Sequence, residues 1–315
     1  MKKKIVTIGG GTGSYVVLRG LKEYPLDITA IVSMFDSGGS SGVLRDEFGV
    51  LPPGDVRRCL VALSEGKRAE IVRDLFNYRF ESGNTLKGHS FGNLLLVALS
   101  SLYGSDIEAI RKASELLDIK GTVLPVSLDK AHLHVVLEDG TEIRGEDNIY
   151  NPKHDGELRV AKAYLQPEAT LFVETAQAIK DADIILICPG SLYASLVPNF
   201  LVKGMREALR ASTAKKVAIS DLMTQWGQTN DFAASDMVKE LLKYSGLERF
   251  DHVICNNAEM DPKLLEAYAR EKKYPIQCDE ALETCAEHVI TGDFFSEADI
   301  ARHDSEKIAK VISAL

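Results

Sequence analysis

The sequence lacks three features that would place the chain in a specialised class of protein. It has no apolar run approaching the ~18 residues of a membrane span, and no signal-peptide core follows the N-terminal lysines. Its net charge is −9, whereas a nucleic-acid-binding face must be basic. Its five cysteines, Cys59, Cys188, Cys255, Cys278 and Cys285, form no CxxC pair. We therefore expect a cytoplasmic protein with buried, reduced thiols, no membrane span and no nucleic-acid partner.

The chain does have a regular alternation of strand-like and helical segments. Hydrophobic residues make up 45% and charged residues 26%, which is ordinary globular composition with enough apolar surface for a core. Short apolar runs at residues 3–8, 28–33 and 184–188 alternate with apolar residues at helical spacing. This βαβ order predicts an α/β fold, a Rossmann-like three-layer sandwich with a mostly parallel sheet.

One stretch in the middle of the chain interrupts that alternation. Residues 132–137 and 141–144 flank an Asp-Gly turn, which is typical of a β-hairpin. We therefore predict a Rossmann-like nucleotide-binding first half over residues 1–118. A small β-rich insertion, serving as a lid or dimer arm, follows over residues 119–165. Residues 166–315 are expected to form the second α/β half of the same domain.

A run of glycines from Gly9 to Gly13 follows the first predicted strand. Glycine lets the backbone turn sharply and approach a ligand, and the next helix start offers free N–H groups to a phosphate. The run is not a dinucleotide fingerprint, since Ser14 stands where the third glycine would fall, and no P-loop lysine follows. A tight turn without ligand is the alternative. We expect phosphate contact from Gly10, Gly11, Thr12 and Gly13.

A second loop follows the second predicted strand, and therefore lies at the same edge of a parallel sheet. Asp36 in this loop could bind a ribose hydroxyl, or Mg²⁺ beside a diphosphate. The alternative is a mobile loop in which Asp36 only caps a turn. The candidate binding residues here are Asp36, Ser37, Gly38, Gly39, Ser40 and Ser41.

Later segments add polar groups at predicted helix starts and strand ends. Arg57 could reach an anion from a helix that Asp55 begins, or both could be a cap and a surface arginine. His89 and Asn93, four residues apart, either brace loops or contact ligand. A Pro-Gly-Ser loop stands, like the first glycine loop, between a predicted strand and a helix start, and could also hold an anion. The candidates are Pro53, Gly54, Asp55, Arg57, His89, Ser90, Asn93, Pro189, Gly190, Ser191, Leu192, Tyr193 and Asn257.

Five motifs in fixed order resemble one known family, that of 2-phospho-L-lactate transferase (CofD) and the gluconeogenesis factor (YvcK). They are the glycine run, Asp36–Arg45, Leu51–Arg57, Gly88–Asn93 and Pro189–Tyr193, and the resemblance extends from residue 4 to at least residue 260. It is closer to the gluconeogenesis-factor branch. That branch is implied to bind UDP-sugars such as UDP-N-acetylglucosamine and to support cell shape and peptidoglycan synthesis during gluconeogenic growth, without catalysis.

The resemblance leaves a transferase as the second hypothesis. The transferase branch moves a phospholactyl group from a guanosine diphosphate carrier to a deazaflavin alcohol with Mg²⁺. An NAD-dependent oxidoreductase is disfavoured by the broken glycine fingerprint. We expect a homodimer that needs no cofactor, although Mg²⁺ remains possible at Asp36. We expect the glycines, Thr12 and the Pro189–Ser191 loop to hold a diphosphate, and Asp36 and Asn257 to contact ribose or base.

The chain departs from the family pattern at five positions. Ser37 stands where the family usually has a second aspartate, which argues against a Mg²⁺-dependent transfer. Arg58 replaces an asparagine, and Cys188 replaces a glycine. Trp226 and Gln228 stand in place of proline and glutamate. These changes either shift ligand preference or mark a diverged subgroup.

Overall fold

A seven-stranded parallel sheet forms the centre of the molecule. The computed structural model describes residues 2–66, 69–296 and 300–315. The strand order is β10-β9-β8-β7-β1-β2-β3, and every neighbouring pair is parallel. The strands are β1 Lys3–Gly9, β2 Leu26–Val32, β3 Thr122–Pro125, β7 Ile184–Ile187, β8 Lys215–Ile219, β9 Phe250–Asn256 and β10 Ala286–Gly292. The predicted α/β fold with a mostly parallel sheet is confirmed.

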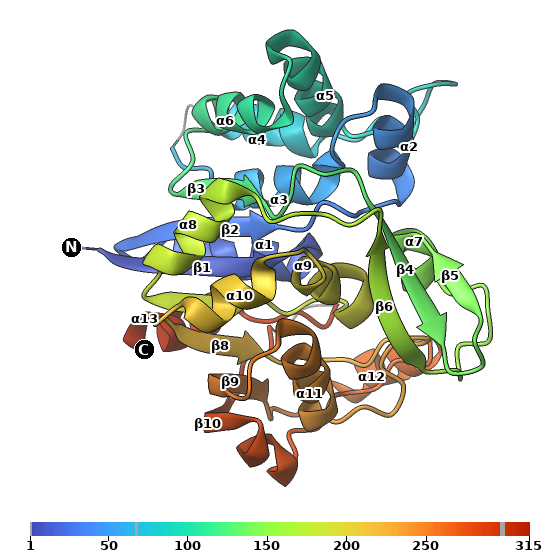
Figure 1. The fold of residues 1–315 in the computed structure, drawn as a ribbon, viewed down its shortest axis with the longest axis vertical. Helices are drawn as coiled ribbons and strands as arrows, with labels where there is room; N and C mark the ends of the chain where they lie inside the picture. Colours follow the sequence, from blue (N-terminus) through green and yellow to red (C-terminus); the bar gives the residue numbers. More distant parts are fainter. Residues whose placement is uncertain (1, 67–68, 297–299) are drawn as a thin grey trace.

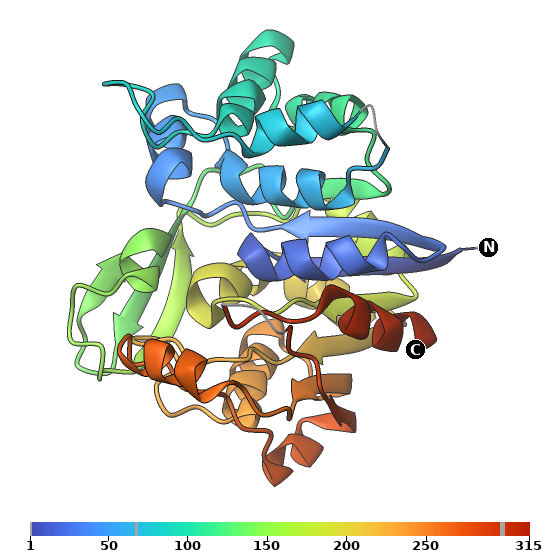
Figure 2. The same cartoon turned by 180° about the vertical axis from the view of Figure 1, so that it is seen from behind.

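Helices cover both faces of this sheet, which is why its central strands are continuous apolar runs. Figure 2 shows α1, α3 and α13 on one face, and Figure 1 shows α8, α10 and α11 on the other. The bounds are α1 Gly11–Leu21, α3 Pro53–Leu63, α13 Ser305–Ala314, α8 Val173–Asp181, α10 Met205–Ala211 and α11 Ala234–Ser245. Their inward residues, such as Leu18, Leu60 and Leu241, have no exposed surface.

Further helices extend the structure beyond these layers. Four of them gather above the β2–β3 edge of the sheet in Figure 1. These are α2 Gly39–Phe48, α4 Ala69–Asn77, α5 Phe91–Tyr103 and α6 Asp106–Leu117. The short helical segments of the second half are η1 Leu192–Leu196, α9 Val197–Phe200, α12 Pro262–Ala269 and η2 Glu280–Thr284. No helix in the part of the chain that the structure describes is long and apolar enough to cross a membrane.

A small antiparallel sheet stands beside the carboxyl ends of the main strands (Figure 1). It has the order β5-β4-β6, with β4 His132–Leu137, β5 Glu142–Arg144 and β6 Val160–Gln166. The predicted insertion of residues 119–165 begins too early, because β3 pairs in parallel with β2. The buried side chains of Val123 and Leu124 make β3 part of the main core.

Two of the five cysteines form a disulfide, so the prediction of five reduced thiols is wrong for this pair. Cys255 is the second-last residue of β9, and Cys278 lies 23 residues later with a Cα–Cα distance of 6.0 Å. Sequence spacing gave no signal because the fold, not a local motif, brings them together. Cys59, Cys188 and Cys285 are free and buried, as predicted.

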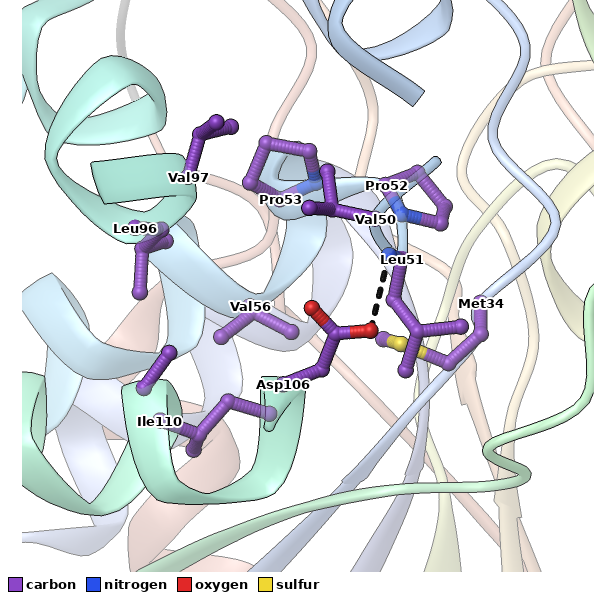
Figure 3. A pocket seen from close by; sticks show the side chains of 11 residues that line it. Met34, Val50, Leu51, Pro52, Pro53, Val56, Leu96, Val97, Asp106 and Ile110 are labelled. Carbon is purple, nitrogen blue, oxygen red and sulfur yellow. Dashed lines mark hydrogen bonds between the residues drawn. The ribbon is translucent and has the colours of Figure 1, made fainter. Parts of the chain in front are cut away.

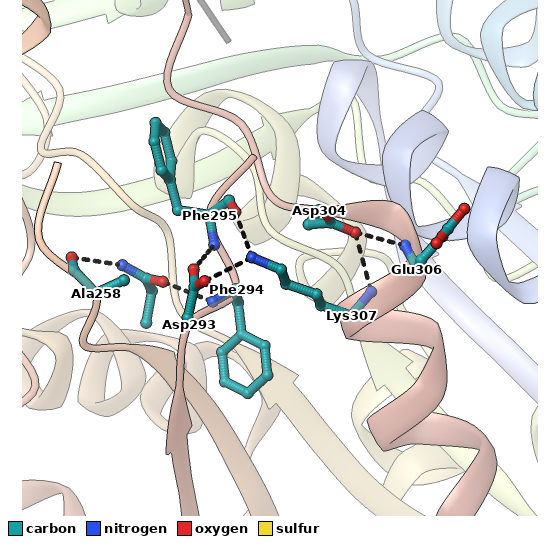
Figure 4. Close-up of polar contacts among 8 residues, drawn as sticks. Ala258, Asp293, Phe294, Phe295, Asp304, Glu306 and Lys307 are labelled. Carbon is teal, nitrogen blue, oxygen red and sulfur yellow. Dashed lines mark hydrogen bonds and ion pairs between the residues drawn. The ribbon is translucent and has the colours of Figure 1, made fainter. Parts of the chain in front are cut away.

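The last helix is tied to the segment that follows β10 (Figure 4). Asp304 accepts hydrogen bonds from the N–H groups of Glu306 and Lys307, and so caps α13. The Lys307 ammonium lies 2.6 Å from Asp293 and donates to the Phe295 carbonyl at 3.2 Å. These contacts hold the beginning of α13 near the carboxyl edge of the sheet, whereas the carbonyl of Leu315, at the end of the chain, accepts from Lys215, the first residue of β8.

Candidate functional site

A cavity of about 330 Å³ opens where β1, β2 and β7 end. Ligands of open α/β sheets bind at this edge, where loops from neighbouring strands meet. The cavity is lined by Gly10, Gly11, Thr12, Gly13, Ser33, Asp36, Asp55, Arg58, Glu146, Tyr150, Gly190, Ser191, Ala194 and Ser195. Eight of the residues predicted from the sequence are therefore brought together.

Two of the predicted loops form one continuous cradle. Helix α1 begins at Gly11, whose φ of +66° suits glycine, and Gly10 provides no capping side chain. The first N–H groups of a helix have no partner within it, so they are available to a phosphate, although that of Gly11 donates to the Asp55 carboxylate here. A Cβ atom on Gly13 would lie 1.8 Å from the Pro189 carbonyl oxygen. The two loops are thus in direct backbone contact.

The second loop places only Asp36 in the cavity wall. Asp36 accepts a hydrogen bond from the Gly38 N–H at 2.8 Å, which fixes the start of α2. Ser37 instead accepts from the Asp147 N–H at 3.0 Å. The remaining predicted residues Gly38, Gly39, Ser40 and Ser41 lie at the beginning of α2 and do not line the cavity.

His89 and Asn93 brace the second loop from α5. The Ser40 hydroxyl lies 3.0 Å from the His89 ring nitrogen and accepts from the Asn93 amide at 3.1 Å. Ser90 caps α5 by accepting from the Asn93 N–H at 3.2 Å. None of these three residues lines the cavity. His89 and Asn93 therefore brace the loop and do not contact a ligand in this cavity.

The arginine that faces the cavity is not the one proposed from the sequence. Arg57 is buried and donates to Asn93 at 3.1 Å and to the Phe76 carbonyl at 3.2 Å, so it points away. Arg58, one residue later on α3, lines the cavity with its guanidinium 3.9 Å from the Asp55 carboxylate. Successive helix residues are rotated by about 100° around the helix axis, so the side chains of neighbouring residues face different surroundings.

Six other predicted residues lie outside the glycine-loop cavity. A Cβ atom on Gly54 would lie 2.3 Å from the Ser41 hydroxyl, which shows how closely α3 approaches α2. Tyr193 is buried and donates to Glu240 at 2.9 Å. Asn257 lines a separate hollow at the end of β9, away from the glycine loops. Pro53 faces the apolar interior beside α5, Leu192 lies in the core, and Pro189 supplies the contact with Gly13.

Sequence reasoning missed six lining residues. They are Ser33, Arg58, Glu146, Tyr150, Ala194 and Ser195. Ser33 directly follows β2, so its position at a strand end was a usable signal. Glu146 and Tyr150 come from α7 (Glu146–Tyr150), a short helix of the insertion that no local motif marks.

Three carboxyl groups converge in the cavity. Burial and the charge of Asp36 raise the pKa of Asp55 to about 6, although the Gly11 N–H donates to its carboxylate. Burial, followed by the charges of Asp36 and Asp55, raises the pKa of Glu146 to about 8. Among the described lining residues Arg58 is the one basic side chain. An anionic ligand therefore needs Arg58, protonated carboxyl groups or a cation.

The fit of Mg²⁺ to these carboxyl groups is partial. In the described ranges, no three histidine, cysteine or acidic side chains are grouped to hold a metal ion by themselves. Mg²⁺ is commonly bound by one or two carboxylates together with substrate phosphates. Asp36 and Asp55 could supply that number of ligands, because both line the cavity. A cation would fit here as the companion of a diphosphate.

A second hollow of about 310 Å³ adjoins the first and shares Thr12, Gly13, Tyr150 and Gly190 with it. Between the two, the Asp221 carboxylate accepts from the Gly190 N–H at 2.7 Å, and burial raises its pKa to about 7. The other lining residues of this second lobe are Val16, Pro189, Leu222, Met223, Tyr268, Ile300, Ala301, Arg302 and His303. The two lobes together have the volume typical of small-molecule sites.

Comparison with known proteins shows the family of the chain. The family model of 2-phospho-L-lactate transferase CofD matches residues 5–295. The chain is 42% identical over 314 residues to the gluconeogenesis factor of Halalkalibacterium halodurans, covering 99% of this chain and 96% of that protein. It is 41% identical to the gluconeogenesis factor of Bacillus subtilis, covering 99% and 97%.

A solved structure extends the similarity to three dimensions. A crystal structure of a Bacillus halodurans protein superposes with a TM-score of 0.94 at 41% identity, covering 99% of this chain and 100% of that one. The resemblance inferred from the five motifs is confirmed. The chain belongs to the CofD family and, within it, is similar to proteins named gluconeogenesis factor.

Proposed function

We propose that this protein binds a UDP-sugar, with UDP-N-acetylglucosamine as the first candidate, and acts as a regulator without turning its ligand over. In this proposal it supports cell morphogenesis and peptidoglycan synthesis during gluconeogenic growth, as the gluconeogenesis-factor resemblance implies. The observation that carries the proposal is the two-lobed cavity around the touching glycine loops. One lobe offers backbone N–H groups to a diphosphate, and the other has room for the rest of the ligand.

Arg58 supports binding of the diphosphate without a metal. Its guanidinium lies beside Asp55 and within 3.7 Å of where a Cβ of Gly11 would stand, so it overhangs the first glycine loop. A guanidinium group binds phosphate through two parallel hydrogen bonds, and this interaction becomes stronger when solvent is excluded. With Glu146 protonated at neutral pH, Arg58 can offset much of the remaining carboxylate charge.

The carboxyl groups of Asp36 and Asp55 favour a transferase as the alternative function. A transferase that uses a guanosine diphosphate carrier would need Mg²⁺, and Asp36 and Asp55 could hold the cation against the phosphates. In that case the carboxyl groups would act as metal ligands in the reaction. The two hypotheses therefore differ in whether a divalent cation is required for binding.

Calorimetric titration with UDP-N-acetylglucosamine, UDP-glucose and GDP, each with and without Mg²⁺, separates them. The regulator predicts micromolar binding of a UDP-sugar that Mg²⁺ does not change. In Arg58→Gln, this binding should weaken about tenfold or more and become dependent on Mg²⁺. Arg111→Gln, on the exposed surface of α6, is the matched control. A preference for GDP that requires Mg²⁺ in the unmodified protein would favour the transferase.

The proposal also includes a cytoplasmic location and a homodimer. Light scattering of the purified protein measures the mass of the assembly, which for a homodimer is twice the chain mass of 34.5 kDa. A mass of one chain across the micromolar range would exclude the homodimer.

A further inference from the structure

Helix α7 carries two cavity residues but is too short to be stable alone. It has five residues, and isolated helices of that length do not persist in water. Glu146 and Tyr150, at its two ends, nevertheless line the cavity. The position of α7 must therefore be fixed by contacts with other parts of the chain.

The beginning of α7 is fixed by the second loop. The Asp147 N–H donates to the Ser37 hydroxyl at 3.0 Å. A Cβ atom on Gly38 would lie 3.1 Å from the Asp147 side chain, so the two segments are closely packed. This contact connects the insertion to the loop after β2.

The end of α7 is fixed by two glutamines that follow β8. The Gln228 side-chain amide donates to the Ile149 carbonyl at 3.3 Å. The Gln225 amide donates to the Tyr150 carbonyl at the same distance. Gln228 is only 4% exposed, whereas Gln225 is closer to solvent. The buried bond of Gln228 is therefore the harder one for water to replace.

The other end of the Gln228 side chain holds the second half of the phosphate cradle. Its carbonyl oxygen accepts from the Ser191 hydroxyl at 2.8 Å, from the Tyr193 N–H at 3.1 Å and from the Ala194 N–H at 3.3 Å. Ser191 and Ala194 both line the cavity. A single side chain thus contacts the cradle through its oxygen and α7 through its nitrogen.

We propose that Gln228 is a positioning residue that couples the Pro189–Ser191 cradle to α7, so that occupation of the cradle and closure of α7 over the ligand stabilise each other. The proposal rests on the proposed function, since it assumes that the ligand lies in this cavity. An amide makes both sets of contacts in this chain because it both accepts and donates. A carboxylate could accept all three cradle bonds, but it would present an oxygen to the Ile149 carbonyl and repel it.

Hydrogen exchange at pH 8 in the ligand-free protein tests the coupling directly. Gln228→Glu should make the amides of residues 147–151 exchange about tenfold faster or more. The amides of Tyr193 and Ala194 should stay protected, because their acceptor is kept. Gln228→Ala should expose both segments, and Gln225→Ala should affect residues 147–151 alone and more weakly. Unchanged exchange of residues 147–151 in Gln228→Glu, in a protein with native thermal unfolding, would overturn the coupling.

Titration of the same variants with UDP-N-acetylglucosamine and with GDP separates this proposal from the function on which it rests. Gln228→Glu should bind the ligand of the unmodified protein about fivefold to tenfold more weakly. Equal affinity in the two proteins would contradict the coupling and leave the proposed function intact. If neither compound binds the unmodified protein while the exchange pattern appears as expected, the positioning role stands and the proposed ligand class fails.

Discussion

Two hollows lie on opposite sides of α3, and they differ in what their polar groups can do. The glycine-loop cavity has about 330 Å³ and is faced by Asp55 and Arg58. The other hollow has about 20 Å³ and is faced by Val56 and Pro53 (Figure 3). The second could hold one water molecule at most, so a ligand site is excluded there by volume.

The polar groups of the two hollows differ as much as their volumes. Asp106 is the one acidic side chain among the described residues of the apolar hollow, and both its oxygens are occupied. It accepts from the Leu51 N–H at 3.2 Å and from the Ser100 hydroxyl at 2.6 Å. In the glycine-loop cavity, burial and the charge of Asp36 raise the pKa values of Asp55 and Glu146, and the first N–H groups of α1 have no partner in the helix. Carboxyl groups with raised pKa values and helix N–H groups without a helix partner distinguish the site from the core.

The largest effect is expected from placing a methyl group between the two glycine loops, which are in backbone contact. In Gly13→Ala, the new Cβ would meet the Pro189 carbonyl at 1.8 Å, and neither backbone can yield easily. We expect a loss of stability of about 1–3 kcal/mol and no measurable binding of a UDP-sugar. Gly190→Ala is the control for stability, because its Cβ would lie 3.5 Å from Leu196, an ordinary contact. Equal urea midpoints for the two variants would contradict the cradle.

The next effect concerns the loss of folding stability that results from burying the Asp55 carboxylate in the glycine-loop cavity. The pKa of Asp55 is raised from 3.8 to about 6 on folding, so the folded state binds more protons between these values. The contribution of Asp55 to stability should therefore fall as pH rises from about 4 to 6 and stay low above, by up to about 3 kcal/mol. Asp55→Asn should be more stable than the unmodified protein at pH 8. Urea unfolding across pH 4–8 measures this, and a decrease in stability of Asp55→Asn at pH 8 would refute it.

Removal of the Asp106 carboxylate from the apolar hollow should lower stability, whereas removal of the Asp55 charge from the glycine-loop cavity should raise it. Asp106→Ala leaves the Leu51 N–H and the Ser100 hydroxyl without their acceptor, which costs about 1–3 kcal/mol. Ligand affinity should be unchanged, since no cavity residue is altered. Asp106→Asn, which keeps one acceptor, should recover part of the loss. The comparison between the hollows fails if Asp106→Ala loses ligand binding at native stability.

The smallest effect is expected from filling the apolar hollow. Val50 is buried and lines it, so Val50→Ile adds one methylene group where there is little empty space. The change in stability should be within about 1 kcal/mol. Binding of a UDP-sugar should be identical to that of the unmodified protein. Any weakening of binding would show that the two hollows communicate through α3.

The parts of the site that were predictable from sequence are those set by local order. A strand followed by glycines and a helix places the loop at the carboxyl edge of a parallel sheet, which located Gly10, Gly11, Asp36 and Gly190. Parallel pairing then aligns these loops without further information. The motif order added the family, which comparison confirmed.

The parts that were not predictable depend on helix phase or on distant segments. Arg57 and Arg58 are both reachable in sequence, and only the packing of α3 decides which one faces the cavity. Glu146 enters the site because its neighbour Asp147 donates to Ser37, 110 residues earlier in the chain, and so folds the insertion back onto that loop. Cys255 and Cys278 pair because β9 ends beside a later loop.

The most direct test of the central claim is a crystal structure of the protein grown with UDP-N-acetylglucosamine. We expect the diphosphate at the N-terminus of α1, contacting the Gly11–Gly13 backbone and Arg58, with the remainder of the ligand in the adjoining lobe beside Asp221. Density for the nucleotide in the separate hollow of Asn257, with the glycine loops empty, would contradict it.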